Sequence, residues 1–190
     1  MRDRFIDPGA IFAGWVGLGM ALVLAIAFEL IIPVQTVVFL LAPLMGVLIG
    51  AYANVRAERW RPRARVLANA AYAGIVTGIG ISLLYVLIRL VFLYGDSGSL
   101  PDGTSLTCPT GPACTYARYV DAGHANELAE LGITDGRSLE AAAWRELTAI
   151  GAGLIVLTAV GGVIGGVARS ASAPKVRERP LLVKPGWDRT

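Results

Sequence analysis

The sequence predicts an all-α integral membrane protein with four transmembrane helices, both termini in the cytoplasm, and a partly helical, disulfide-bearing extracytoplasmic loop. Three observations predict this fold class. The chain of 190 residues is 55% hydrophobic and only 16% charged, whereas a soluble domain is about 45–50% apolar and about 25% charged. Its apolar residues gather in four segments of bilayer length, and its basic residues lie mostly on one side of those segments. This composition excludes an ordinary soluble globule, and it also excludes intrinsic disorder, which requires low hydrophobicity.

Four segments are long enough to cross a bilayer, whose core of about 30 Å needs about 20 apolar residues in a helix. Each is predicted to be helical, because a lipid-exposed segment must satisfy its own backbone hydrogen bonds. The four spans are 10–32, 36–53, 66–94 and 147–168, of which the last is expected to extend outward to residue 139. The remaining segments are a cytoplasmic N-terminus (1–9), a basic cytoplasmic loop (54–65), the extracytoplasmic loop (95–146) and a basic cytoplasmic tail (169–190).

The first span also has features of a cleavable signal peptide. Arg2 and Arg4 precede it, and Ala25-Ile26-Ala27 has the small-x-small form of a cleavage site. However, the apolar run before Ala25 is about as long as the upper limit for the apolar region of a signal peptide. We therefore expect this segment to be retained as a true span.

The distribution of lysine and arginine predicts the orientation, because these residues mark the cytoplasmic side of a membrane protein. With both termini inside, 13 of the 17 basic residues lie in cytoplasmic segments and three lie in the extracytoplasmic loop. Termini on the same side require an even number of spans, which four retained spans provide. The expected location is the cell membrane, with the large loop in an oxidising compartment.

The pI of 9.1 reflects this asymmetry and does not indicate a nucleic-acid partner. A nucleic-acid site would need a folded basic face with aromatic side chains that stack on bases, and the basic loop offers only Trp60. Its arginines are instead expected to contact anionic lipid head groups, at about 1 kcal/mol each near the surface. These arginines are Arg56, Arg59, Arg61, Arg63 and Arg65.

Small residues recur at four-residue spacing along the spans. Because lipid is as apolar as leucine, membrane helices associate where small residues let their backbones approach closely. The pattern predicts a tight bundle packed within the chain. The alternative is that one of these seams docks another subunit, since the fourth span carries glycines on more than one face. The central glycines of the three longest seams are Gly46 and Gly50, Gly74 and Gly78, and Gly162 and Gly166.

Glu29 and Arg89 are the ionisable residues inside the predicted spans, and such intramembrane charges are functional hypotheses by default. Both lie roughly 5–8 Å below the outer boundary, at a rise of about 1.5 Å per residue, and both share a helix face with small residues. The pattern predicts an intramembrane ion pair that ties the first span to the third. Its role is left open between a structural clamp and an ion or substrate site.

The extracytoplasmic loop carries eight acidic residues against three arginines, and it holds both cysteines of the chain. Cys108 and Cys114 flank Pro-Thr-Gly-Pro-Ala, which suits a tight turn, and disulfides persist in an oxidising compartment. We predict a disulfide between them, worth ~2 kcal/mol for so small a ring. A metal site is not expected, because two cysteines and the single His124 cannot supply four ligands.

Two helical features are expected in the outer part of the chain. Residues 116–131 are predicted to form one short amphipathic helix that Gly132 ends. Ser138 is expected to cap the long helix that leads into the fourth span, and that helix could exceed ~40 Å and project beyond the membrane. The apolar side of the short helix is expected to consist of Tyr119, Val120, Leu128 and Leu131.

The chemistry in the sequence favours no enzymatic activity and no cofactor. One histidine, two cysteines expected to be bonded and glycine runs that lie in membrane helix leave no catalytic set. The first hypothesis is a non-enzymatic accessory or scaffold subunit of a larger membrane complex, with membrane lipids and other integral membrane subunits, or further copies of itself, as partners. One alternative is a small transporter or channel, which rests on a kink expected at Pro43, on the glycines and on the Glu29–Arg89 pair. Another is a membrane-anchored binding or sensor module that uses the acidic outer loop.

Overall fold

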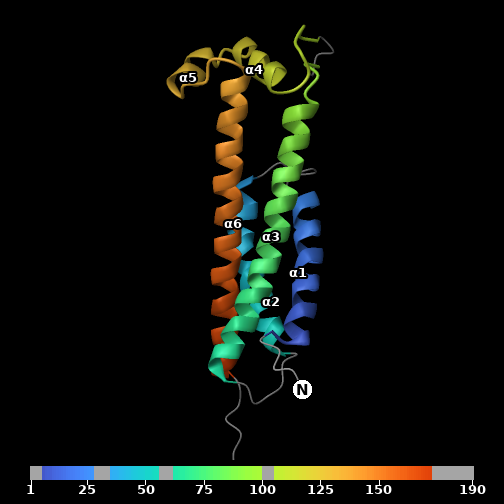
Figure 1. Cartoon of the computed structure of the whole chain (residues 1–190), viewed down its shortest axis with the longest axis vertical. Helices are drawn as coiled ribbons and strands as arrows, with labels where there is room; N and C mark the ends of the chain where they lie inside the picture. The colour runs from blue at the N-terminus through green and yellow to red at the C-terminus, as the bar shows by residue number, and fades with distance from the viewer. Residues whose placement is uncertain (1–5, 28–34, 56–61, 100–104, 173–190) are drawn as a thin grey trace, which may run out of the picture.

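The described part of the chain is almost entirely helical (Figure 1). The computed structural model describes residues 6–27, 35–55, 62–99 and 105–172. In these ranges, long helices lie side by side and two short helices lie across one end of them. The helices are α1 (Pro8–Ala25), α2 (Gln35–Val55), α3 (Arg63–Gly95), α4 (Pro112–Asp121), α5 (Ala125–Glu130) and α6 (Gly136–Ser172).

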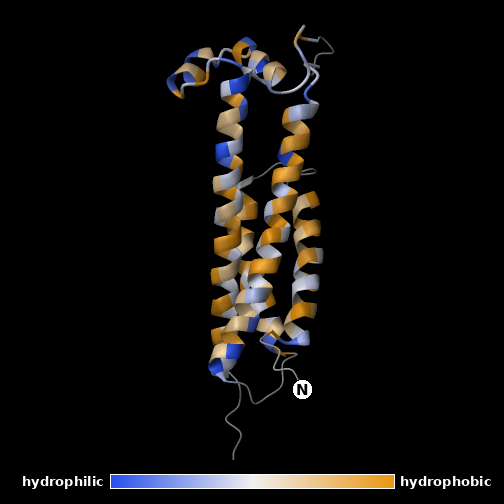
Figure 2. Cartoon of the chain, viewed as in Figure 1, coloured by the Kyte–Doolittle hydropathy of each residue, from blue (hydrophilic) through white to orange (hydrophobic). Residues whose placement is uncertain are grey.

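Four of these helices, α1, α2, α3 and α6, are long and apolar enough to cross a membrane. The all-α class with four candidate spans is therefore confirmed. Figure 2 shows hydrophobic residues along the bundle and hydrophilic residues toward its two ends. The helix α6 includes the predicted fourth span together with an outward extension of more than ten residues. The end of the first predicted span, at residue 32, lies outside the described residues.

Small side chains fill the bundle, and large apolar side chains cover it. Ala13, Ala42 and Ala73 are fully buried, whereas Trp15 is 69% exposed and Leu40 is 65% exposed. In water so much exposed apolar surface would mark an interaction site or an aggregation hazard, but lipid tails are as apolar as leucine. We therefore expect the helices to be held by close backbone approach more than by burial of large side chains.

The closest approaches place α6 between α2 and α3. A methyl carbon added to Gly50 of α2 would lie 2.6 Å from the carbonyl carbon of Gly162 in α6. One added to Gly162 would lie 2.6 Å from the carbonyl oxygen of Ala70 in α3. Real Cβ atoms do not approach other atoms so closely. Any residue could adopt the helical conformation at these positions. Glycine is required there because the backbones of two helices are in contact.

The helix α6 presents two rows of glycines to its neighbours. Gly161 and Gly165 face the backbone carbonyl groups of Pro43 and Val47 on α2, whereas Gly162 and Gly166 lie where α6 contacts both α3 and α2. Pro43 lies inside α2 without ending it. At these positions the structure uses the small-residue seams for packing within the chain. All the central seam glycines lie at such contacts: Gly46, Gly50, Gly74, Gly78, Gly162 and Gly166.

Polar side chains inside the bundle bond to their own helix or to a neighbouring one. Thr77 and Thr158 each donate a hydrogen bond of 2.8 Å to the carbonyl oxygen four residues earlier. Where α1 begins, the Asp7 backbone N–H donates to Asn69 Oδ1 at 3.1 Å, and Asn69 Nδ2 donates to Asp7 Oδ2 at 2.7 Å. Asp7 is 3% exposed and Asn69 is fully buried. This reciprocal pair fastens the start of α1 to α3.

Replacement of Gly162 by valine is expected to destabilise the bundle. The added side chain would meet the backbone of α3, and α6 cannot retreat from α3 without pressing on α2. Overpacking of this kind costs about 1–3 kcal/mol, and each 1 kcal/mol lowers the unfolding midpoint of a chain of this size by about 2–4 °C. The midpoint can be measured in detergent by size-exclusion chromatography of heated samples.

The matched control is Gly153→Val on the same helix, where an added methyl carbon meets nothing within 4 Å. This substitution makes the same chemical change in the same helix, so it should leave the midpoint nearly unchanged. Equal midpoints for Gly162→Val and Gly153→Val would contradict the close contact between α3 and α6.

Candidate functional site

The polar end of the bundle carries the candidate functional site. The outer parts of α3 and α6 extend beyond α1 and α2, and α4 and α5 lie across their end (Figure 1). We call the described residues 96–99 and 105–135 the cap. The cap belongs to the segment that the sequence predicts as the extracytoplasmic loop, and it contacts α6 and α3 through α4.

Cys108 and Cys114 cross-link the cap, as the sequence predicts. Their sulfur atoms lie at disulfide distance, and their Cα atoms are 5.0 Å apart. Gly98 packs directly against this disulfide, because a methyl carbon added there would lie 2.7 Å from Cys114 Sγ and 2.8 Å from Cys108 Sγ. Gly98 also has a φ of +79°, which glycine adopts without strain. The disulfide therefore orders the segment that leaves α3 as well as the turn before α4.

Asp96 joins the end of α3 to α4. Its carboxylate accepts hydrogen bonds from the backbone N–H of Gly98 and from the hydroxyl of Thr115. The Arg118 guanidinium lies 2.5 Å from the same carboxylate, and the Asp96 side chain is 9% exposed. The backbone carbonyl of Asp96 accepts a further bond from the N–H of Gly111 at 2.8 Å. A largely buried carboxylate with this many donors is held in one position, and its charge is balanced by Arg118.

The prediction of one helix over 116–131 is wrong. The chain forms α4 and α5 there, and between them Gly123 has a φ of +88°. A residue in this left-handed region ends an α-helix, so the glycine breaks the segment into two. The apolar side predicted for a single helix is divided as well. The exposed fractions are 7% for Leu128, 39% for Val120, 48% for Tyr119 and 72% for Leu131.

The residue that caps α6 is Asp135, and the prediction of Ser138 is wrong by three positions. The Asp135 carboxylate accepts from the Ser138 N–H at 2.7 Å, and the Ser138 hydroxyl accepts from the Asp135 N–H at 3.0 Å. This is a reciprocal capping box. The helix can start at Gly136 because only glycine lets it approach α4: a methyl carbon there would lie 2.6 Å from the Cα of Ala113. The bond from the Ser138 backbone N–H, followed by that from its side chain, holds the pKa of Asp135 below its ordinary value.

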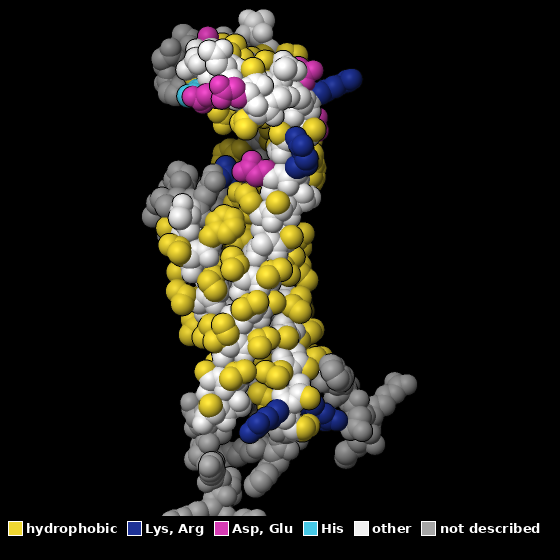
Figure 3. All heavy atoms as spheres, turned by 90° about the vertical axis from the view of Figure 1, so that its left-hand side faces the viewer, with side chains coloured by type: hydrophobic (Ala, Val, Ile, Leu, Met, Phe, Trp, Pro, Cys, Tyr) yellow, Lys and Arg dark blue, Asp and Glu magenta, His cyan; other side chains and the backbone are white. Residues whose placement is uncertain are grey.

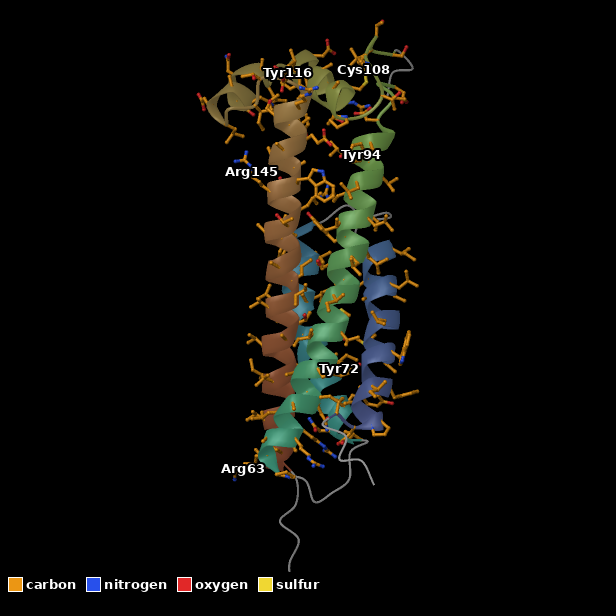
Figure 4. All side chains as sticks on the ribbon, viewed as in Figure 1. Arg63, Tyr72, Tyr94, Cys108, Tyr116 and Arg145 are labelled. Carbon is orange, nitrogen blue, oxygen red and sulfur yellow. A yellow bond between two sulfur atoms is a disulfide. The ribbon has the colours of Figure 1, made fainter. Side chains whose placement is uncertain are left out.

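Tyr94, labelled in Figure 4, lies on α3 below the cap, and its hydroxyl is hydrogen-bonded to two residues of α6. The Tyr94 hydroxyl donates a hydrogen bond to a carboxylate oxygen of Glu140. The Trp144 indole N–H donates to the Tyr94 oxygen at 3.3 Å. Tyrosine and tryptophan are enriched at the membrane–water interface. We call the hydrogen bonds among Tyr94, Glu140 and Trp144 the Tyr94 clasp. It holds α3 and α6 together at the level where a membrane–water interface is expected.

A cavity of about 790 Å³ lies between the cap and the outer parts of α3 and α6. Figure 3 shows a hollow between the cap and the bundle, with acidic and basic side chains at its edge. The cavity opens where the glycine seam ends, because large side chains replace small ones beyond the contact of Gly151 with Ser82. Its size falls within the range of small-molecule sites, about 300–1,000 Å³. The charged residues that line it are Arg89, Asp96, Arg118 and Glu146, and the aromatic ones are Tyr85, Phe92 and Tyr119.

Arg89 lines this cavity from α3. Its guanidinium carbon lies 5.5 Å from the ring centre of Tyr85, which is a cation–π distance. The predicted partner of Arg89, Glu29, lies outside the described residues. The Glu29–Arg89 ion pair therefore stays a prediction.

The basic loop predicted to contact anionic lipid is described only in part. Arg63 and Arg65 lie in the first turn of α3, and Figure 4 shows Arg63 at the end of the bundle away from the cap. Contact with lipid head groups stays a prediction for both. The other arginines of that loop lie outside the described residues: Arg56, Arg59 and Arg61.

The structural roles of Asp7 and Asp96 were not predicted from the sequence. Asp7 falls in a segment assigned to the cytoplasm, although Pro8 directly after it is a signal for a helix start. Asn69 is a further signal, since a polar side chain in a span seeks a partner. No local pattern predicts that Asp96 meets Arg118, because 22 residues separate the two and a turn, a disulfide and a helix bring them together.

No protein-family model, no curated protein and no solved structure matches the chain. In the described ranges, no three His, Cys, Asp or Glu side chains form a group that could hold a metal ion. The geometry itself defines the class of protein: a helical bundle with four candidate membrane spans, which carries a disulfide-linked cap over an amphipathic cavity.

Replacement of both cysteines by serine, Cys108→Ser with Cys114→Ser, should loosen the cap and leave the bundle folded. The cross-link is worth ~2 kcal/mol in the chain-entropy model, and it makes no contact with the glycine seams. A loss of that size raises the population of the open cap by about 30-fold. Limited trypsin digestion should therefore cleave after Arg118 about 30-fold faster than in the wild type.

The unfolding midpoint of the bundle is the control in this experiment, and it should stay within a few degrees of the wild-type value. Cleavage at the wild-type rate in the double variant would show that the disulfide does not order the cap.

The start of α6 is expected to loosen in acid. Because the pKa of Asp135 is lowered in the folded chain, the stabilising effect of this cap is fully present above the pKa of an unfolded aspartate, about 3.9. It is lost as the pH falls through the lower pKa of the folded state. Amide hydrogen exchange at Ser138 and Leu139, corrected for the intrinsic rate, should therefore accelerate below about pH 4. Asp135→Asn keeps an acceptor but does not titrate, so the same acid dependence in that variant would contradict this role of the carboxylate.

Proposed function

We propose that this chain is a non-enzymatic accessory or scaffold subunit of a larger membrane complex, in which the cap docks a neighbouring subunit. The observation that carries the proposal is an acidic surface held beyond the bundle by its two longest helices, α3 and α6. The excess of basic residues at the opposite end supports an orientation with the termini in the cytoplasm and the cap outside.

The docking surface that we propose lies on α5. Glu127 and Glu130 are three residues apart on this helix, so they share a face, and both are exposed. Leu131, next to them, is 72% exposed and adds an apolar contact to this acidic face. Acidic side chains beside an exposed apolar one favour a partner with a basic rim around an apolar contact.

Order in the cap supports this use. The disulfide, the bonds of Asp96 and the Asp135 cap of α6 hold the short helices in place. A surface that is already ordered loses less conformational entropy on binding than a flexible loop does. This is what a docking element of a stable complex needs.

The transporter or channel alternative has weaker support. In the described bundle, α6 approaches both α2 and α3 backbone to backbone, which leaves the centre of that contact without space for water. A membrane-anchored binding module is the second candidate function, and the cavity beneath the cap favours it.

The proposal is tested by purification of the tagged chain, in mild detergent, from the membranes of the cell that makes it. We expect a complex that contains at least one other integral membrane protein. The variant Glu130→Arg should recover at least about tenfold less of this partner, because like charges across an interface are strongly repelled. Native gel electrophoresis with quantitative mass spectrometry measures the recovery.

The control is Arg169→Glu, an exposed charge reversal of the same size at the other end of α6, which should recover the partner as the wild type does. A wild-type chain that is isolated without a partner would overturn the proposal, and so would full recovery with Glu130→Arg. A homo-oligomer that carries ions across liposome membranes would support the channel instead.

A further inference from the structure

We propose that the cavity beneath the cap binds the head group and glycerol region of a zwitterionic glycerophospholipid, with its acyl chains directed into the membrane. This site rests on the second candidate function, a binding module. It is separate from the docking surface on α5, since neither Glu127 nor Glu130 lines the cavity.

The walls of the cavity are amphipathic, as such a ligand requires. Phe92 and Leu93 of α3 face the space together with Leu139 and Leu147 of α6. Guanidinium and carboxylate groups lie in the same lining. Sites for small molecules combine mostly apolar walls with a few polar groups that orient the ligand. An amphiphile can satisfy both kinds of surface at once, whereas a fully polar ion or a bare hydrocarbon can satisfy only one.

The described lining offers groups of both signs, and this selects a zwitterionic head group. Arg118 supplies a guanidinium and Glu146 supplies an exposed carboxylate. The phosphate can lie at the guanidinium of Arg118 and the ammonium at the carboxylate of Glu146. An anionic head group has no ammonium for this carboxylate and would bring a like charge toward it, which is unfavourable.

One buried donor in the lining has the position that a phosphate would use. The Nη2 of Arg118 donates hydrogen bonds to the carboxylate of Asp96 and to the carbonyl oxygen of Ser99. Its Nε is buried and has no hydrogen-bond partner among the described residues. Buried donors are normally satisfied, and a phosphate oxygen is a strong acceptor for guanidinium.

The level of the cavity also suits a lipid head group. Its lining begins at Tyr85, which packs in the same core cluster as Leu24 near the end of α1. From Tyr85 to the cap, α3 rises by about 15 Å at about 1.5 Å per residue, so the cavity spans the outer end of the bilayer core as well as the polar layer, which is about 5–8 Å thick on each side. The hollow in Figure 3 opens sideways between the cap and the bundle, so a lipid could enter from the membrane surface.

The test uses the purified full chain in detergent, titrated with short-chain lipids below their micellar concentration. We expect dihexanoyl phosphatidylcholine to bind at least about tenfold tighter than dihexanoyl phosphatidylglycerol or dihexanoylglycerol, as measured by calorimetry. Inorganic phosphate should not bind. Equal binding of inorganic phosphate would show an anion site and overturn the proposal, and equal binding of dihexanoylglycerol would show only an apolar surface and overturn it too.

A matched pair of variants tests the place of binding. Ala143 lines the cavity, and Ala143→Phe should fill it and weaken phosphatidylcholine binding at least about tenfold. Ala141→Phe adds the same side chain at an exposed position of α6 outside the lining, and it should bind as the wild type does. Equal affinities for the two variants would overturn the assignment to this cavity.

A third variant tests the charge argument. Glu146→Gln removes the carboxylate proposed to receive the ammonium, while it keeps the size of the side chain. The ratio of phosphatidylcholine to phosphatidylglycerol affinity should fall by about tenfold, and an unchanged ratio would overturn the zwitterion selection. Because the chain is tested alone, failure here leaves the co-purification result unaffected, and loss of the partner in Glu130→Arg leaves lipid binding unaffected.

Discussion

The contact of three helix backbones, α2, α6 and α3, is the constraint on which the rest of this structure depends. Burial of apolar side chains gives no net driving force between helices in lipid, so association depends on van der Waals packing and a few polar bonds. Gly50 and Gly162 let α6 touch α2, and Gly162 also lets it touch Ala70 of α3. Large side chains are consequently placed on the outside, where lipid accepts them.

The candidate site lies directly beyond the outer end of this backbone contact between α3 and α6. Beyond Gly151 and Ser82, larger residues such as Tyr85 and Leu147 face the space between α3 and α6. Farther out, the Tyr94 clasp and the cap join the two helices again. A cavity follows between the end of the seam and the cap, and its polar groups come from both the helices and the cap.

Much of the fold could be predicted from local patterns, and much of the site could not. The apolar lengths predict the helices, the small-residue spacing predicts which faces approach, and the six-residue separation of Cys108 and Cys114 predicts their pairing. The break at Gly123 and the start of α6 at Gly136 were missed, because a glycine's effect depends on what lies against it. Asp7 and Asp96 are buried at junctions between helices. Their burial likewise depends on residues distant in sequence, so no local pattern indicates it.

The sequence by itself determined the class of this protein: all-helical, with four segments apolar enough to cross a membrane and a disulfide between two nearby cysteines. These properties depend on composition and short-range spacing, which no tertiary contact alters. Only the tertiary structure decided that the seam glycines meet within the chain, that Asp96 binds Arg118, and that a cavity separates the cap from the bundle. Each of these depends on residues distant in sequence, whose approach is set by the packing of whole helices.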